Sequence, residues 1–261
     1  MTHTSSTQQP QGCTLLKIYG EREHYYNTRN YCIFAVRNVW MYNVAMNFDL
    51  IIFDFDGTLG DTRQKIVRTL QQTMREIGLP VADEKSCAAT IGVPLAEAYR
   101  QLFPDITAEM AESYAEHYRR TFEANKQHLI PDLFPHVADT LAQLHAKGLK
   151  MTIASSRTSK SLRWFLQEMG LERYFAFVIG AEDVQKAKPD PEPVLTTLAK
   201  MGIKAERALV VGDMAVDILM GSRAGARTCG VTYGNGSRED LLAAGADFLV
   251  DDIGELAGIM N

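Results

Sequence analysis

Two aspartates separated by a single residue follow an apolar run near position 50. The run covers residues 50–53, and Asp54 and Asp56 come directly before Gly57 and Thr58. Residues two apart in a strand face the same side, so the two carboxylates can converge on one site. Burying carboxylates is costly unless a cation or a reacting group meets them. The pattern therefore predicts a functional site at the end of this strand.

Further polar side chains follow other apolar runs along the chain. They are Ser155 and Ser156, Lys188 in a proline-rich loop, and Asp213 with Asp217 one helical turn later. Ligands of doubly wound sheets bind beyond the carboxyl ends of the strands, so we expect these groups to gather beside Asp54 and Asp56. Carboxylate oxygens are the ligands that Mg²⁺ prefers. Serine hydroxyl, lysine ammonium and the amides of glycine turns suit a phosphate.

The elements that would position these residues alternate along the chain. Apolar, β-rich runs occur at 50–56, 149–156, 175–180, 208–213 and 228–233. Helical patterns lie between most of them, and two of these patterns end near Gly148 and Gly170. This alternation predicts an α/β fold with a doubly wound parallel sheet that helices cover on both faces.

One long stretch interrupts the alternation, because residues 62–132 show helical periods and no convincing strand. We predict a smaller, all-helical domain over 62–132 and an α/β core domain built from 46–61 and 133–261. Residues 1–45 have no clean period. We expect them to be a poorly ordered and dispensable extension, since Met46 would make a natural start for the core.

The amino-acid composition limits the classes of molecule that this protein is expected to bind. The 261 residues are 46% apolar, enough for a large core, and the formal net charge of -5 is spread without a basic block. This disfavours nucleic acid and anionic membranes as partners and favours a small molecule. Four dispersed cysteines without a CxxC pair predict reduced thiols and a cytoplasmic protein. Neither a bilayer-spanning segment nor a signal peptide is evident.

Taken in order, the polar groups resemble the four motifs of the haloacid dehalogenase superfamily over residues 48–258. The first motif is matched by "DFDGTLGD" and the second by Ser155 in "IASS". The third is matched by Lys188 in "KPDPEP", and the fourth by "GDMAVD" with Asp213 and Asp217. The helical insertion resembles the first-position (C1-type) cap of that family.

The resemblance implies a two-step phosphoryl transfer. Asp54 would attack phosphorus and form an aspartyl-phosphate. Asp56 would protonate the departing alkoxide and later take a proton from the hydrolytic water. The sequence leaves the protonation state of Asp56 open.

The same resemblance implies a magnesium site and a phosphate site. Mg²⁺ would be held by Asp54, the backbone carbonyl of Asp56 and Asp213, with Asp217 acting through water or by orienting Lys188. Ser155 and Lys188 would hold the other phosphoryl oxygens. Ser156, Gly57 and Thr58 complete the expected substrate-binding set, Gly57 through the backbone conformation of the turn and Thr58 by supporting it.

Two features bear on the substrate. Asp56 argues against dehalogenation, because a leaving halide needs no acid. The segment "TIGVPLAEAYR" resembles the "GxPL" form of phosphoglycolate phosphatase-like and pyrophosphatase-like members. Phosphomutases of the β-phosphoglucomutase type carry Ser-Arg in place of Pro94 and Leu95. They also tend to have Glu in place of Gly212. The resemblance implies a phosphatase for a small phosphomonoester, with phosphoglycolate as the leading candidate. Hydrolysis of pyrophosphate or a nucleotide, a phosphomutase, and a non-catalytic phosphate-binding regulator stay open.

A few other residues invite a functional interpretation. Arg157 could approach the leaving group or lie at the surface. The cations Arg100, Arg119, Arg120 and Lys126 could meet a charged substrate, but we expect most of them to form a solvated helix face. Tyr114, Tyr118 and Phe122 have i, i+4, i+8 spacing, which is typical of helix core.

Overall fold

A computed structural model describes residues 13–16, 24–27, 31–36, 39–42 and 48–260. The chain divides into two compact units, one formed by Met1–Asn47 with Gly258–Asn261 and the other by Phe48–Ala257. The first unit contains an antiparallel sheet in the order β1-β2-β3-β4. Its strands are β1 (Cys13–Leu16), β2 (His24–Asn27), β3 (Tyr31–Val36) and β4 (Val39–Tyr42). The expectation for the rest of residues 1–45 lies outside the described residues and stays a prediction.

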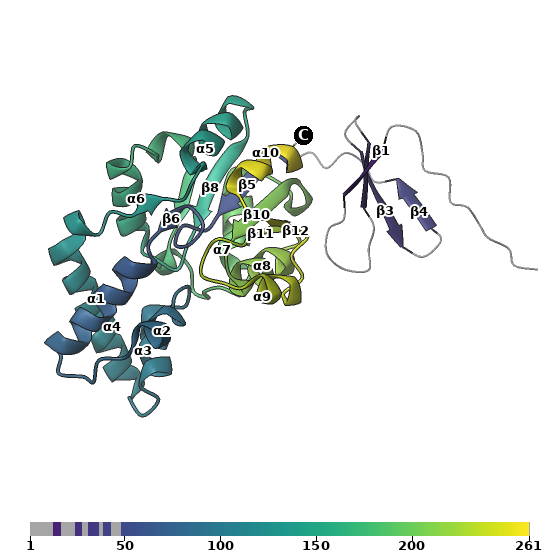
Figure 1. Cartoon of the computed structure of the whole chain (residues 1–261). Helices are drawn as coiled ribbons and strands as arrows, with labels where there is room; N and C mark the ends of the chain where they lie inside the picture. Colours follow the sequence, from purple (N-terminus) through teal and green to yellow (C-terminus); the bar gives the residue numbers. More distant parts are fainter. Residues whose placement is uncertain (1–12, 17–23, 28–30, 37–38, 43–47, 261) are drawn as a thin grey trace, which may run out of the picture. The chain divides into compact units, whose positions relative to one another are not determined.

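The second unit is built on a six-stranded parallel sheet (Figure 1). In spatial order its strands are β12 (Phe248–Val250), β11 (Arg227–Val231), β10 (Ala208–Gly212), β5 (Leu50–Phe53), β8 (Lys150–Ala154) and β9 (Phe177–Ile179). The predicted doubly wound α/β fold is confirmed. Sequence analysis missed β12, which is a three-residue edge strand and too short to show a period.

The central strands β5 and β10 are buried along their whole length, as their continuous apolar sequences require. The helices of the α/β part are α5 (Val137–Ala146), α6 (Ser159–Glu168), α7 (Glu192–Met201), α8 (Ala215–Arg223), α9 (Arg238–Ala243) and α10 (Leu256–Ile259). Leu50 and Ile52 belong to the same core cluster as Val194 of α7 and Met220 of α8. This packing fixes β5 in the middle of the sheet and so fixes the residues that follow it.

Residues 63–128 contain helices and loops only, and the prediction that they form a separate domain stays a prediction. We call α1 (Arg63–Glu76), α2 (Glu84–Ala88), α3 (Leu95–Leu102) and α4 (Ala108–Asn125) the cap. Helix α1 packs on α2 and α4, and α3 packs on α4. The core of the cap includes Leu70, Met74, Tyr99 and Ala115. The exact domain boundaries stay a prediction.

The chain leaves the sheet for the cap and returns to it through two neighbouring short strands. Strands β6 (Gly60–Asp61) and β7 (Asp132–Leu133) pair antiparallel, with Gly60 opposite Leu133. Two-residue strands carry no periodicity, so sequence analysis did not predict them. Their pairing places the two connections of the cap side by side.

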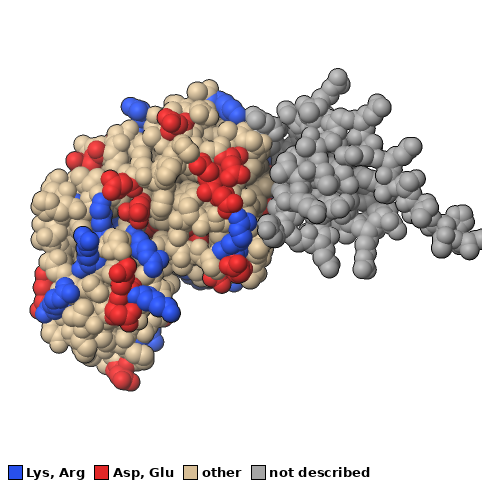
Figure 2. All heavy atoms as spheres, in the orientation of Figure 1, with Lys and Arg blue, Asp and Glu red and all other residues tan. Residues whose placement is uncertain are grey.

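Figure 2 shows lysine and arginine side chains interspersed with aspartate and glutamate over the visible face of the described residues, without an extended basic surface there. This agrees with the charge distribution along the sequence. Among the described residues, none of the helices has the length and apolar character needed to cross a bilayer.

Candidate active site

A buried lysine joins two aspartates beneath the carboxyl end of the sheet. Lys188, in the loop before α7, donates from Nζ to Oδ1 of Asp54 at 2.6 Å and to Oδ1 of Asp217 at 2.7 Å. The three side chains are at most 10% exposed. Burial acts to lower the pKa of Lys188, but the charges of Asp217 and Asp54 outweigh it and hold the pKa above its ordinary value. Lys188 is therefore a fixed cation.

Asp213, directly after β10, is held by three donors. Its Oδ1 accepts from Oγ1 of Thr58 at 3.1 Å, and its Oδ2 accepts from the backbone N–H of Asn235 at 2.6 Å and from Nδ2 of Asn235 at 3.1 Å. Burial raises the pKa of Asp213 to about 7, with the charge of Asp217 adding to the shift and the hydrogen bonds opposing it. Burial likewise raises the pKa of Asp54 well above its usual range, with Lys188 opposing. Lys188 alone therefore does not offset the cost of ionising these buried carboxylates together, and a further cation would favour their charged forms.

These carboxylates fit a divalent cation. Asp54, Asp213 and Asp217 each offer one oxygen, and the three oxygens lie within 4.8 Å of one another. The backbone carbonyl of Asp56 lies next to the same centre, because Nδ2 of Asn235 is 3.5 Å from it and also contacts Asp213. Hard oxygen donors and unbalanced negative charge are what Mg²⁺ requires. The structure brings the three predicted carboxylates together, and the prediction that they hold Mg²⁺ with the main chain of Asp56 stays a prediction.

The side chain of Asp56 pairs with Arg157. Nη2 of Arg157 donates to Oδ1 of Asp56 at 2.7 Å, and Nε donates to Oδ2 at 3.1 Å. The two side chains are only 10% and 13% exposed. The sequence left two interpretations open for Arg157, a position near the leaving group and a position at the surface. The surface position is wrong. Burial acts to lower the pKa of Arg157, but the charge of Asp56 outweighs it and raises the pKa.

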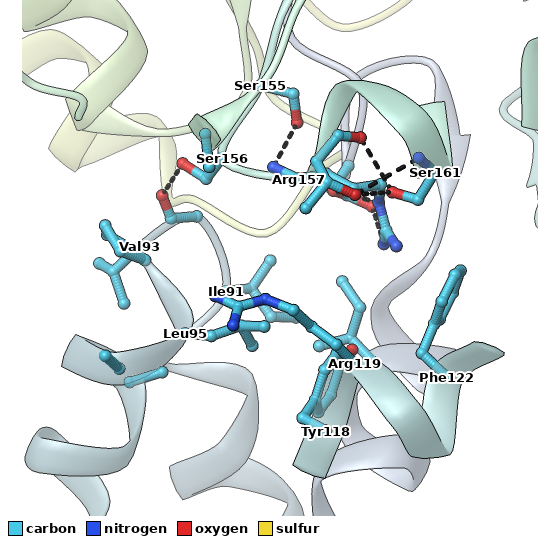
Figure 3. Close-up of a pocket in the computed structure, with 18 of the residues that line it drawn as sticks. Ile91, Val93, Leu95, Tyr118, Arg119, Phe122, Ser155, Ser156, Arg157 and Ser161 are labelled. Carbon is cyan, nitrogen blue, oxygen red and sulfur yellow. Dashed lines mark hydrogen bonds and ion pairs between the residues drawn. The ribbon is translucent and has the colours of Figure 1, made fainter. Parts of the chain in front are cut away.

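A cavity of about 420 Å³ lies over Asp54 and Asp56, between the carboxyl end of the sheet and the cap. Figure 3 shows Ser155, Ser156 and Arg157 facing cap side chains across it. The cap wall is mostly apolar and includes Leu70, Ile91, Val93, Leu95, Tyr118 and Phe122, with Arg119 beside them. Tyr118 and Phe122 are buried, as their spacing predicted, yet they also line the cavity.

Comparison with known proteins agrees with this geometry. Residues 51–231 match the family model described as haloacid dehalogenase-like hydrolase. The chain belongs to this family. Among solved structures, a haloacid dehalogenase-like hydrolase of Bacteroides fragilis superposes with a TM-score of 0.75 at 28% identity, covering 80% of this chain and all of the other.

Curated relatives of this hydrolase are phosphatases by name. The "Probable phosphatase IndB" of Dickeya dadantii is 35% identical over 80% of this chain and 92% of its own length. Pyrophosphatase PpaX of Anoxybacillus flavithermus is 33% identical over 83% of this chain and 98% of its own. Phosphoglycolate phosphatase of Vibrio cholerae is 32% identical over 81% of this chain and 96% of its own. The chain is accordingly a phosphatase-type enzyme of the family.

The serines of the second motif occupy two different places in this hydrolase. Ser155 is buried beside the cavity, and its Oγ accepts from the backbone N–H of Arg157 at 3.3 Å. Ser156 also lines the cavity, but its hydroxyl donates to the carbonyl of Gly92 in the cap at 2.7 Å. Ser156 therefore joins the core to the cap, and its contact with substrate stays a prediction.

The turn after β5 is shaped by close approach to the loop after β11. Gly57 has φ of 91°, and a Cβ there would come within 2.2 Å of both Asp213 and Asn235. Only glycine fits this conformation and this gap. Thr58 supports Asp213, and its carbonyl accepts from the hydroxyl of Tyr233 at 2.8 Å. Neither Gly57 nor Thr58 is among the described residues that line the cavity, so their role in substrate binding stays a prediction.

Sequence analysis missed Asn235 and left Arg157 undecided. Asn235 lies in a glycine-containing loop after β11, and no family motif that we recognised includes it. Its only signal was its place after the carboxyl end of a predicted strand.

Proposed function

We propose that this enzyme is a Mg²⁺-dependent phosphatase that hydrolyses a small phosphomonoester through an aspartyl-phosphate on Asp54. One observation carries the proposal: Asp54 belongs both to the buried carboxylate cluster and to the wall of the cavity. A nucleophile at that boundary reaches substrate from one side and a cation from the other.

The residues divide the chemistry between them. Mg²⁺, held by Asp54, Asp213 and the carbonyl of Asp56, would offset the repulsion between the anionic nucleophile and the phosphoryl group. Lys188 fixes the orientation of the Asp54 carboxylate through the hydrogen bond to its Oδ1. Asp217 accepts from Lys188 with Oδ1 and from the backbone N–H of Met214 with Oδ2, so it acts mainly by orienting Lys188.

Two displacements at phosphorus complete the reaction. In the first, a bond forms from the Asp54 carboxylate to phosphorus, the ester bond breaks, and Asp56 gives a proton to the leaving alkoxide. In the second, water attacks phosphorus while Asp56 takes its proton, which releases inorganic phosphate and restores Asp54. The Ser155 hydroxyl, at the cavity wall beside Asp54, would hold a phosphoryl oxygen during both steps.

The side chains that line the cavity indicate which kind of leaving group the enzyme accepts. Its apolar cap wall of Ile91, Val93 and Leu95 suits an organic alcohol better than a second phosphoryl group. Arg119 lies in the same wall and pairs with Glu116 at 3.2 Å, and it would meet a substrate carboxylate by exchanging that partner. Together with the relatives named phosphoglycolate phosphatase, this favours 2-phosphoglycolate as the first substrate to test. Pyrophosphate is the second candidate, because other relatives carry the name pyrophosphatase.

A phosphomutase finds less support. A Cβ at Gly212 would lie 2.3 Å from Cβ of Asp217. The glutamate that phosphomutases tend to carry at this position therefore has no room in this arrangement.

The direct experiment measures hydrolysis of p-nitrophenyl phosphate with Mg²⁺, with EDTA, and with Mg²⁺ added back in excess. We expect turnover only when the metal is present, followed by a higher kcat/KM for 2-phosphoglycolate than for pyrophosphate. Absence of any metal-dependent turnover would instead favour a phosphate-binding regulator.

A further inference from the structure

We propose that Arg157 is a positioning residue that fixes the carboxylate of Asp56 and couples its orientation to the cap. The inference rests on the proposed phosphatase function, and it names the residue that orients the general acid and base of that reaction. It starts from the two hydrogen bonds that Arg157 makes to Asp56.

The contact leaves Asp56 little freedom. The guanidinium engages both carboxylate oxygens through two different nitrogens, which sets the plane of the carboxylate as well as its distance. A lysine at the same place would be a point charge and could not fix that plane. Both side chains are almost fully buried, so water does not compete strongly for the same contacts.

The guanidinium is itself held between the core and the cap. Its central carbon lies 4.9 Å from the ring centroid of Phe165 on α6 and 5.4 Å from that of Phe122 on the cap helix α4. The two rings meet edge to face at 5.8 Å, and Phe165 also stacks on Phe55, the residue between the two catalytic aspartates. Cations bind favourably to such ring faces when water is excluded. Movement of α4 would remove one of the two rings that hold Arg157.

The backbone around Arg157 is fixed as well. Its carbonyl accepts from the N–H of Ala181, and its own N–H donates to Oγ of Ser155. The preceding residue, Ser156, donates to the carbonyl of Gly92 in the cap. This loop therefore touches the cap at two points, one through Ser156 and one through the Arg157 side chain.

The contact between Arg157 and Asp56 affects proton transfer to the leaving group. A general acid works only when it lies within hydrogen-bond reach of the leaving oxygen and in the right direction. Arg157 would hold the ionised carboxylate of Asp56, the form that takes the proton of the hydrolytic water, and one of the two hydrogen bonds would be released when Asp56 carries the proton for the leaving alkoxide. Loss of Arg157 should therefore slow reactions that need the acid and spare those that do not.

The first test uses Arg157→Lys, which keeps the charge but lacks the two-nitrogen contact, and Arg157→Met, which removes the charge. We expect kcat on an alkyl phosphate to fall by about 10²-fold in both variants, as small misplacements of catalytic groups do. On p-nitrophenyl phosphate, whose leaving group needs little protonation, the loss should be much smaller, and KM should change little for either substrate. Arg163→Met, on the exposed side of α6, serves as the control and should behave as wild type.

The second test is a double-mutant cycle with Asp56→Asn. If Arg157 acts through Asp56, then adding Arg157→Met to Asp56→Asn costs little further activity. The double variant also leaves no unpaired buried charge, so it keeps the test valid if Arg157→Met alone folds poorly. Phe122→Leu should show the same leaving-group pattern with a smaller loss.

Two results would overturn the inference in an active enzyme: equal losses on good and poor leaving groups, or multiplying losses in the double variant. Either would give Arg157 a structural role and leave the phosphatase intact. A wild-type protein without metal-dependent turnover would overturn the proposed function and this inference with it.

Discussion

The buried charged cluster beneath the cavity, the floor, and the cap wall above it, the roof, differ in how tightly hydrogen bonds hold their side chains. What we call the floor is the buried cluster of Asp54, Lys188, Asp213 and Asp217, and of these four only Asp54 is among the described residues that line the cavity. Each of these side chains is buried and hydrogen-bonded to another member or to a fixed donor. The roof, formed by the cap, is a mostly apolar wall that also carries charged side chains, Arg119 among them. The difference suggests that the floor determines the reaction and the roof determines which leaving group is accepted.

The origin of the two regions explains the difference. The floor comes from the ends of neighbouring parallel strands, β5 and β10, and from the loop and helix beside them. Parallel register brings these ends together, so one misplaced charge would be left without a partner. The roof comes mainly from faces of α1, α3 and α4 and the loop before α3, where one apolar residue can replace another at lower cost.

The largest expected effect is at the nucleophile. Asp54→Asn should lower turnover by on the order of 10⁴-fold or more, because no other group can take its place at phosphorus. The fold should persist, since the change removes one of three crowded carboxylates. Asp49→Asn is a matched control at the opposite, exposed end of β5 and should keep full activity. Turnover that survives Asp54→Asn would rule out the covalent step.

Lys188→Met should damage stability as well as activity. It leaves Asp54 and Asp217 buried without their counter-ion, which should lower the free energy of unfolding by about 3–5 kcal/mol in metal-free protein. Urea denaturation measures this, and added Mg²⁺ should recover part of the loss. Lys186→Met, a largely exposed lysine on the same loop, is the control and should change stability by less than about 0.5 kcal/mol. Equal stabilities for the two variants would contradict the account of the floor.

The smallest effect is expected in the roof. Arg119→Ala should raise KM for 2-phosphoglycolate by about 10-fold, as expected for loss of one charged hydrogen bond, and leave p-nitrophenyl phosphate unaffected. Arg120→Ala is the matched control, because Arg120 is the next residue of α4 and is not among the described residues that line the cavity. A KM for 2-phosphoglycolate that is the same in both variants would remove Arg119 from substrate binding.

The same contrast explains what could be predicted from the sequence. The fold class followed from strand and helix patterns long enough to show a period, whereas β12 and the β6–β7 pair are too short to show one. Asp54, Lys188, Asp213 and Asp217 could be grouped in advance because strand ends of a parallel sheet meet at one edge, and the structure brings them together.

The pairing of Arg157 with Asp56 could not be predicted in the same way. It depends on the direction of a side chain in a loop and on two aromatic rings from distant helices. The helical spacing of Tyr118 and Phe122 predicted burial, but it could not show that the same residues face a cavity.

The most direct test of the central claim is a crystal structure of the protein with Mg²⁺ and BeF₃⁻, a mimic of the phosphoryl group. The account predicts beryllium bound to a carboxylate oxygen of Asp54, with the cation held between Asp54 and Asp213 and Ser155 contacting a fluoride. Beryllium fluoride absent from Asp54, or bound to another side chain, would contradict it.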